Sequence, residues 1–254
     1  MTRDRLVERV VGVGSPLALL AIWEGCAQLG WIDVRFFPPP SHIVQQAWDL
    51  SKTGALWTNL WASLQRLFWG FLLGGIPALA LGILMGLYRP IRAAIDPLVS
   101  ATYPVPKSAI LPLVVLIFGL DEMSKIVMVA LGVFYPVLIN TVTGVRQIDR
   151  IYLDVGQNFH ASRWQVFRTI AFPGALPSIM AGIKLGVGMG LILIAISEMV
   201  GAQSGLGYMI WNAWQILSVE TMYVGLCAIA VLGFVFNLIL HEIERWILPW
   251  RDAR

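Results

Sequence analysis

The sequence predicts an all-α fold, a polytopic membrane helical bundle of about six transmembrane helices with both termini in the cytoplasm. The chain is 57% hydrophobic and only 13% charged, whereas soluble domains carry roughly 25% charged residues. Its mean hydropathy is +0.73. Apolar runs recur along it at roughly 20 residues each, the length that a helix needs to cross the hydrocarbon of a bilayer. The 254 residues suit one membrane domain, 1–254.

The expected spans are Val10–Leu29, Leu60–Tyr88, Pro97–Leu120, Ile126–Val145, Leu176–Val200 and Tyr223–Leu248. The first follows a basic N-terminus and is either a signal peptide or a retained signal-anchor. Its length and the lack of an A-x-A cleavage site favour the anchor. The third contains Pro104, Pro106 and Pro112. Broken backbone at membrane depth borders a cavity or a packed protein interior.

Lysine and arginine predict the orientation, because cytoplasmic loops carry an excess of both. With the N-terminus inside, the inner segments contain Arg3, Arg5, Arg9, Arg89, Arg92, Arg146, Arg150, Arg163, Arg168, Arg245, Arg251 and Arg254. The outer segments contain Arg35, Lys52 and Lys125. This bias places the loop 146–175 in the cytoplasm.

Small residues at four-residue spacing predict close helix packing. They are Gly70 with Gly74, Gly82 with Gly86, and Gly182, Gly186 and Gly190. Such a stripe serves either a dimer contact or packing inside one bundle, and we favour the second. Cys26 and Cys227 lie in apolar runs, so we expect buried thiols rather than a disulfide.

The loop 146–175 contains an amphipathic helix. Ile151, Val155 and Phe159 recur every four positions and therefore share one helix face. Two interpretations remain open on these residues alone. The helix offers its apolar face to a cytoplasmic protein, or it lies on lipid headgroups.

Ionisable residues inside the spans are costly and are therefore placed against a partner, a cavity or the interface. Arg66 lies near the outer end of its span and is expected to snorkel. We take a polar set as candidates for a translocation pathway: Tyr103, Lys107, Ser108, Lys184 and Glu198. The alternative is that the lysines snorkel or pair structurally near the inner face.

Motifs for catalysis are missing from the sequence. It contains no G-x-x-x-x-G-K-[ST] phosphate loop and no H-E-x-x-H. No Cys or His cluster has the spacing of a metal site, and no nucleophile has a base beside it. We therefore expect no catalytic residue, no metal and no enzyme activity in this chain.

Four stretches resemble one family of membrane proteins. They are P-V-P-K-S-A-I-L-P-L-V-V-L-I-F-G-L-D-E-M-S-K at Pro104–Lys125, S-L-Q-R-L-F-W-G-F at Ser63–Phe71, S-E-M-V-G-A-Q-S-G-L-G-Y at Ser197–Tyr208 and E-R-W-I-L-P-W-R at Glu244–Arg251. Together they are similar to permease subunits of type I ABC importers, in the nitrate/sulfonate/taurine-type branch.

The cytoplasmic loop fits that family's E-A-A…G motif loosely. Asp154 stands for the Glu, Val155 and Gly156 stand for the alanines, and His160 stands for the Gly. Pro173 matches the closing proline. The His in place of Gly adds bulk and a titratable group at that position.

The resemblance implies an importer in the bacterial cytoplasmic (inner) membrane. Two copies of this subunit would form the pathway, two ABC ATP-binding subunits would carry ATP and Mg, and an extracytoplasmic binding protein would deliver a small organic or inorganic anion. The partners would also include membrane lipid but no nucleic acid. The core permease region would be 58–248 and the coupling loop 146–175. The ATPase interface would comprise Ile151, Asp154, Val155, Gly156, Phe159, His160, Ala161 and Trp164.

Two other classes of protein remain as alternatives. A stand-alone secondary transporter would be expected to have repeated halves, and we find no convincing internal repeat. A membrane-embedded enzyme would need a convergent set of catalytic groups, which the sequence does not contain.

Overall fold

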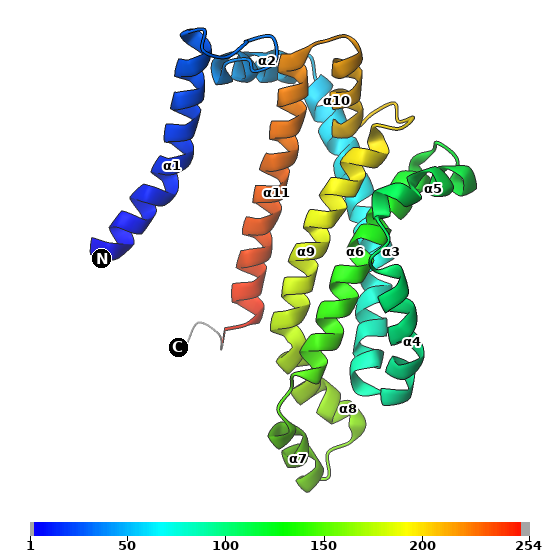
Figure 1. The fold of residues 1–254 in the computed structure, drawn as a ribbon. Helices are drawn as coiled ribbons and strands as arrows, with labels where there is room; N and C mark the ends of the chain where they lie inside the picture. Colours follow the sequence, from blue (N-terminus) through cyan, green and yellow to red (C-terminus); the bar gives the residue numbers. More distant parts are fainter. Residues whose placement is uncertain (1–2, 250–254) are drawn as a thin grey trace.

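The computed structural model describes residues 3–249, and in this range it contains helices and turns but no β-strand (Figure 1). The all-α prediction is therefore confirmed. Arg251 and Arg254, which we counted among the inner arginines, lie outside the described residues. The α-helices are α1 (Arg3–Gln28), α2 (Pro40–Lys52), α3 (Ala55–Leu87), α4 (Arg89–Thr102), α5 (Leu111–Phe118), α6 (Glu122–Arg146), α7 (Arg150–Asn158), α8 (Arg163–Val166), α9 (Phe172–Glu198), α10 (Leu206–Gln215) and α11 (Val219–Ile247).

Two further helical segments differ from the α-helix. A 3₁₀ turn, η1, covers Lys107–Ile110, and a π-helix, η2, covers Phe167–Ala171. The described residues contain four helices long and apolar enough to cross a membrane: α3, α6, α11 and the continuous Trp164–Glu198 segment. A fifth span results if α4 and Lys107–Phe118, bent by 86°, are taken as one broken span. The prolines predicted this break.

The first expected span forms helix α1, but α1 is not among those candidates. Its C-terminal part contacts α2, and its Trp23 ring lies 5.5 Å from the Tyr223 ring of α11, while the rest of α1 stands apart from the other helices (Figure 1). The four or five candidate spans are thus the part of the six-span expectation that the described residues support.

Helix α6 lies between α3 and α9, and its buried Val133 and Leu138 form the centre of the core. The glycine stripe of α3 faces α6. A Cβ on Gly74 would lie 2.3 Å from the carbonyl oxygen of Ala130. Because no side chain fits there, only glycine permits this helix spacing. On α9, Gly182 faces Pro136 and Asn140 of α6 in the same way. Packing inside one bundle, the interpretation that we favoured, is confirmed.

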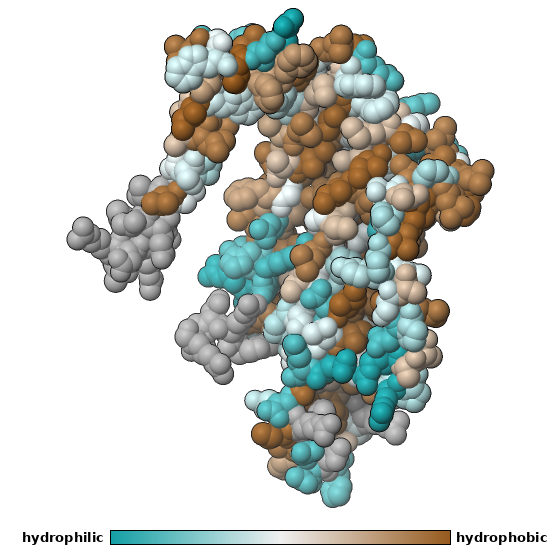
Figure 2. All heavy atoms as spheres, in the orientation of Figure 1, coloured by the Kyte–Doolittle hydropathy of each residue, from teal (hydrophilic) through white to brown (hydrophobic). Residues whose placement is uncertain are grey.

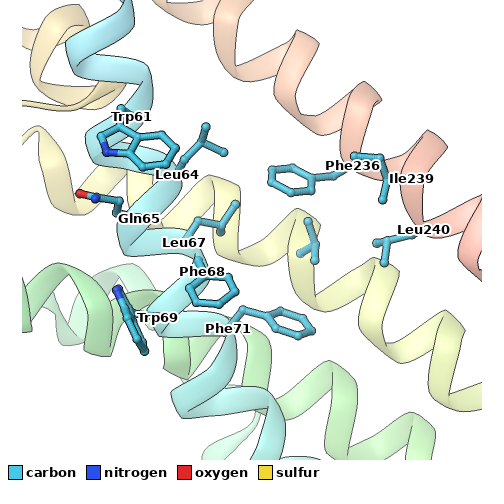
Figure 3. Close-up of a pocket in the computed structure, with 11 residues that line it drawn as sticks. Trp61, Leu64, Gln65, Leu67, Phe68, Trp69, Phe71, Phe236, Ile239 and Leu240 are labelled. Atoms are coloured by element: carbon cyan, nitrogen blue, oxygen red, sulfur yellow. The ribbon is translucent and has the colours of Figure 1, made fainter.

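Helix α11 packs more loosely against the other spans. A groove of about 550 Å³ runs between α3, α9 and α11, lined by Trp61, Phe68, Phe236 and Leu240 among others (Figure 3). Its lining is almost entirely hydrocarbon, as expected for helices surrounded by lipid tails. Cys227 on the same helix is exposed, so the expectation of a buried thiol is wrong there; Cys26 is half-buried.

The two ends of the bundle differ and are named here by their helices. The α7 end contains α7 and α8, and the α10 end contains α2, α5 and α10 (Figure 1). Hydrophobic residues cover much of the surface between them, while hydrophilic residues gather toward the α7 end (Figure 2). This distribution is the one expected for a chain whose middle faces lipid.

Candidate functional site

Helix α7 presents apolar side chains to solvent. Asp149 precedes it, and its carboxylate accepts a hydrogen bond from the backbone N–H of Ile151 at 3.0 Å. Ile151 and Phe159 are 65% and 82% exposed, and Val155 is exposed as well. Trp164, on the following helix, is also exposed. Four exposed apolar side chains within one short segment form a candidate binding surface.

The other side of α7 is held against the bundle through Gly156, which is buried. A Cβ there would come within 3.2 Å of Val166 and of Ile170, so a small residue sets how closely α7 approaches the next helix. Asp154 is exposed and Ala161 half-buried. These two residues therefore lie at the edge of the patch.

The turn after α7 is built by local chemistry. His160 has φ 51°, a left-handed conformation that is costly for a residue with a Cβ and that glycine adopts freely. Ser162 then starts α8 as a capping box. The backbone N–H of Ser162 donates to the side-chain oxygen of Gln165 at 2.7 Å, and the backbone N–H of Gln165 donates to the Ser162 hydroxyl at 3.3 Å.

Helix α8 continues into α9 through the π-helix η2. Phe167 begins it and contacts the rings of Trp164 at 5.4 Å and Phe172 at 5.9 Å between centroids. These aromatic contacts pack α8 against the start of α9. Single π-turns of this kind are frequent at functional sites.

The break between α4 and α5 forms the second polar site. The Lys107 ammonium donates to the backbone oxygens of Thr102, Tyr103 and Val105 at 2.8, 3.0 and 2.9 Å. It also lies 4.1 Å from the centroid of the Tyr135 ring. The lysine thereby satisfies carbonyl groups that the Pro104–Pro106 break sets free.

A pocket of about 530 Å³ opens beside this break. Tyr103 and Lys107 line it from one side and Tyr135, Leu185 and Met189 from α6 and α9. Ser108 is exposed beside Lys107. In the part of the chain that the structure describes, Lys107 forms no ion pair, so its charge is uncompensated by a carboxylate.

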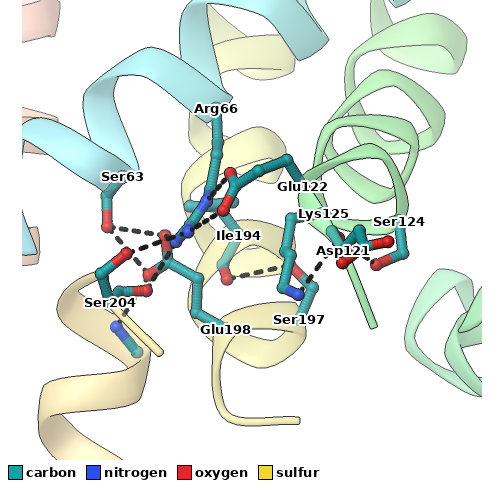
Figure 4. Close-up of polar contacts among 12 residues, drawn as sticks. Ser63, Arg66, Asp121, Glu122, Ser124, Lys125, Ile194, Ser197, Glu198 and Ser204 are labelled. Atoms are coloured by element: carbon teal, nitrogen blue, oxygen red, sulfur yellow. Dashed lines mark hydrogen bonds and ion pairs between the residues drawn. The ribbon is translucent and has the colours of Figure 1, made fainter. Parts of the chain in front are cut away.

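The third polar site is buried at the α10 end (Figure 4). The Arg66 guanidinium donates through Nη1 to Glu198 Oε1 at 2.8 Å. It donates through Nε and Nη2 to the two carboxylate oxygens of Glu122, each at 2.6 Å. Arg66 is only 3% exposed, so the expectation that it snorkels is wrong. A partner on another helix is available within the bundle, and pairing there avoids the cost of an isolated charge.

Glu198 also orders the start of α10. Its carboxylate accepts hydrogen bonds from the Ser63 hydroxyl at 2.8 Å and from the backbone N–H of Gly207 at 2.9 Å. The Ser63 hydroxyl oxygen accepts the N–H of Leu206 at 2.8 Å. The first N–H groups of α10 are thus satisfied by side chains of α3 and α9. A Cβ on Gly205 would overlap Glu198 at 2.3 Å, which accounts for the glycine.

The structure divides the pathway candidates among three places. Tyr103, Lys107 and Ser108 lie together at the break. Lys184 forms an ion pair with Glu244 between α9 and α11, and Glu198 lies in the Arg66 cluster. Sequence analysis missed Ser63 and Glu122 as partners of these charges. The sequence did indicate that such partners exist, because a charged side chain inside a span is costly unless it meets a counter-charge, a cavity or the interface.

Comparison with known proteins supports a transporter assignment. The family model for the inner membrane component of binding-protein-dependent transport systems matches residues 78–249. The inward-facing MetNI methionine ABC transporter contains a chain of similar fold, with a TM-score of 0.61 and 17% identity, covering 77% of this chain and 95% of that one. At this identity the likeness concerns the fold alone.

Sequence relatives cover almost the whole chain. The taurine transport system permease protein TauC of Escherichia coli is 32% identical over 94% of this chain and 89% of its own length. The putative aliphatic sulfonates transport permease protein SsuC of the same organism is 36% identical over 94% and 90%. The riboflavin transport system permease protein RibX of Chloroflexus aurantiacus is 30% identical over 93% and 88%.

Proposed function

This chain belongs to the family of binding-protein-dependent transport system inner membrane components, and on that premise we propose that it imports a small sulfonate-like anion. It is the permease component of an ABC transporter and a non-catalytic membrane subunit. The system depends on a binding protein and on an ATPase. We propose that ATP and Mg bind to two separate ATPase subunits, and that a second copy of this chain completes the pathway.

The cargo class rests on one observation, the 32–36% identity to taurine and aliphatic sulfonate permeases over 94% of the chain. Lys107 supports it physically, because an uncompensated ammonium beside the pocket favours an anionic solute. RibX, at 30% identity, shows that a similar permease carries a different solute, so the cargo needs its own test.

We propose that the ATPase binds the α7 end. The exposed Ile151, Val155 and Phe159 would enter a groove of the ATPase, with Trp164 as a second aromatic contact and Asp154, Gly156, His160 and Ala161 completing the interface. The aromatic joint at Phe167 would carry the motion of the ATPase into α9 as a rigid-body shift. The coupling loop is 146–175, inside a single permease domain with its core at 58–248.

We propose that Tyr103, Lys107 and Ser108 line the pathway directly. Lys184 and Glu198, which are held in ion pairs, would fix the helices that form its wall. The broken span supports this arrangement, since irregular backbone at membrane depth borders a cavity.

We propose six spans with both termini in the cytoplasm, α1 being the first. This orientation puts the α7 end in the cytoplasm and the α10 end outside. Single cysteines at Asn158 and Thr53, both exposed, test it in intact cells. A membrane-impermeant thiol reagent is expected to label Thr53→Cys only. Labelling of both positions from outside would contradict this topology.

Uptake tests the function as a whole. The permease, co-purified with its ATPase and reconstituted with its binding protein in liposomes, is offered taurine, ethanesulfonate, nitrate and riboflavin. ATP-dependent accumulation of the two sulfonates is expected. Accumulation of riboflavin alone would overturn the cargo class, and uptake without ATP or the ATPase would overturn the ABC mechanism.

A further inference from the structure

The Arg66 guanidinium has two sides that are bonded differently. Its inner side, through Nη1, meets Glu198, which is 1% exposed, and the backbone oxygen of Ser204 at 2.6 Å. Its outer side, through Nε and Nη2, meets the carboxylate of Glu122, whose side chain is 65% exposed. Figure 4 shows Arg66 between these two carboxylates. The inner bond is closed off from water by burial, whereas the outer carboxylate borders water, into which its side chain has room to turn.

The outer side also has the geometry of a receptor for oxyanions. Nε and Nη2 hold one oxygen each at 2.6 Å, the parallel two-point contact by which arginine recognises carboxylate and other planar or tetrahedral oxyanions. The Ser204 hydroxyl lies 3.1 Å from Nη2 and offers a further donor for a third oxygen. A sulfonate group has the three oxygens that this arrangement accepts.

The charges of the cluster are divided between buried and exposed groups. The buried members are Arg66 and Lys125, both positive, and Glu198, which is negative. The exposed Glu122 and Asp121 add two negative charges beside them (Figure 4). When Glu122 turns outward, the outer side of the Arg66 guanidinium loses its charge partner, and an anion from solution takes that place.

We propose that Arg66 is a weak binding site for the sulfonate group of the cargo at the α10 end, and that Glu122 is an internal anion that the cargo displaces. The proposal rests on the proposed function, which makes the cargo an anion and the α10 end the outer one. A tethered competitor keeps the site from holding its ligand tightly. Weak binding is what passage requires, because an ion or solute must leave each site that it enters.

A titration tests the site directly. The purified permease–ATPase complex is heated in neutral detergent with increasing ethanesulfonate, and the rise of the unfolding temperature gives the half-saturating concentration. Glu122→Gln removes the competing charge and keeps the side-chain volume, so this concentration is expected to fall at least tenfold. Ethyl methyl sulfone, which is neutral, is expected to have no effect on either protein.

Glu220→Gln is the matched control. Glu220 lies in the first turn of α11 at the same end of the molecule, and it forms no ion pair within residues 3–249. Its half-saturating concentration is expected to equal that of the parent. Adding Arg66→Gln to Glu122→Gln, in a complex that still assembles, is expected to abolish the gain.

Several results would overturn the proposal. They are an unchanged titration in Glu122→Gln, a gain that survives the removal of the Arg66 charge, and stronger stabilisation by phosphatidylglycerol than by ethanesulfonate, which would assign the site to a lipid headgroup. The proposed function fails separately. If the parent imports no sulfonate in liposomes, the cargo class is wrong, while the ethanesulfonate titration still decides whether Arg66 binds the oxyanion.

Discussion

The α10 end and the α7 end differ in which of their side chains have partners within the chain. At the α10 end Arg66, Glu198 and Ser63 tie α3, α6, α9 and the start of α10 together, and almost every polar group in the cluster has a partner. At the α7 end, short helices expose Ile151, Phe159 and Trp164 and leave apolar surface uncovered. The polar groups of the α10 end are paired within the chain, whereas the apolar side chains of the α7 end are left exposed.

This difference suggests separate roles for the two ends when the transporter changes conformation. A satisfied buried network holds its helices in one arrangement, so the bonds of Glu198 with Arg66 and Ser63 keep α3, α9 and the start of α10 moving together. The exposed apolar segment joined to α9 by an aromatic π-turn is the surface that we propose the ATPase binds. We infer that force enters at the α7 end and that the α10 end keeps the bundle intact while it moves.

The largest effect is expected from breaking the Arg66–Glu198 pair. Arg66→Met leaves Glu198 buried without its charge partner, which costs about 3–5 kcal/mol of unfolding free energy. The measurement is denaturant unfolding of the purified permease in detergent. The double variant Arg66→Met with Glu198→Gln removes both charges and is expected to recover part of this loss. Equal stability of Arg66→Met and parent would mean that the cluster does not hold the α10 end.

Sequence reasoning located the exposed end better than the buried one. The stripe of Ile151, Val155 and Phe159 is local, since a helix repeats every few residues and a face can be counted. The Arg66–Glu198 bond joins residues 132 positions apart, and no local pattern specifies which distant charge will meet which. The cost of a buried charge predicts that a partner exists but does not identify it.

The break in the third span was predictable for a related reason. Pro104 and Pro106 cannot donate backbone hydrogen bonds, so local chemistry interrupts the helix. That Lys107 would donate to the freed carbonyls was not predictable, because the flexible side chain of a lysine can reach several acceptors. The expectation that Arg66 snorkels was wrong for a similar reason. Its guanidinium could reach either water or a carboxylate, and only the packed bundle brings the carboxylate close.

The next largest effect concerns the α7 end. Phe159→Asp places a charge where an apolar side chain is proposed to enter the ATPase groove, at a cost of several kcal/mol, or a few orders of magnitude in binding. Insertion and folding of the spans are expected to be unchanged, because Phe159 is exposed. Pull-down of the ATPase subunit measures the loss.

The control for this variant is Phe159→Leu, which keeps an apolar side chain and is expected to retain most of the ATPase. If Phe159→Asp binds the ATPase as the parent does, the α7 patch is not the docking surface. A lipid-surface helix would then account for its exposed residues.

A smaller effect separates two kinds of ion pair. The side chains of Lys184 and Glu244 are 27% and 11% exposed, against 4% and 0% for Arg66 and Glu198. Water already screens the first pair in part, so Lys184→Met is expected to cost about 1–2 kcal/mol in the same unfolding experiment. A loss equal to that of Arg66→Met would show that exposure does not rank the two sites.

The smallest effect tests whether the backbone at His160, in the turn after α7, is strained when no ATPase is bound. His160 is held at φ 51°, a conformation that glycine adopts without the Cβ penalty. We expect His160→Gly to raise the free energy of unfolding by about 1 kcal/mol, because the relief of this penalty exceeds the entropy that glycine adds to the unfolded chain. If the ATPase binds this turn in the same conformation, the affinity of the permease for the ATPase is expected to rise roughly fivefold. The measurement is a titration of labelled permease with ATPase.

The control is Leu217, which has φ 58° at the α10 end, because Leu217→Gly provides the same relief far from the proposed ATPase surface. It is expected to raise the unfolding temperature and leave ATPase affinity unchanged. Tighter ATPase binding in both variants would mean that the gain comes from the overall stability of the permease. The conformation of the His160 turn would then make no specific contribution to ATPase binding.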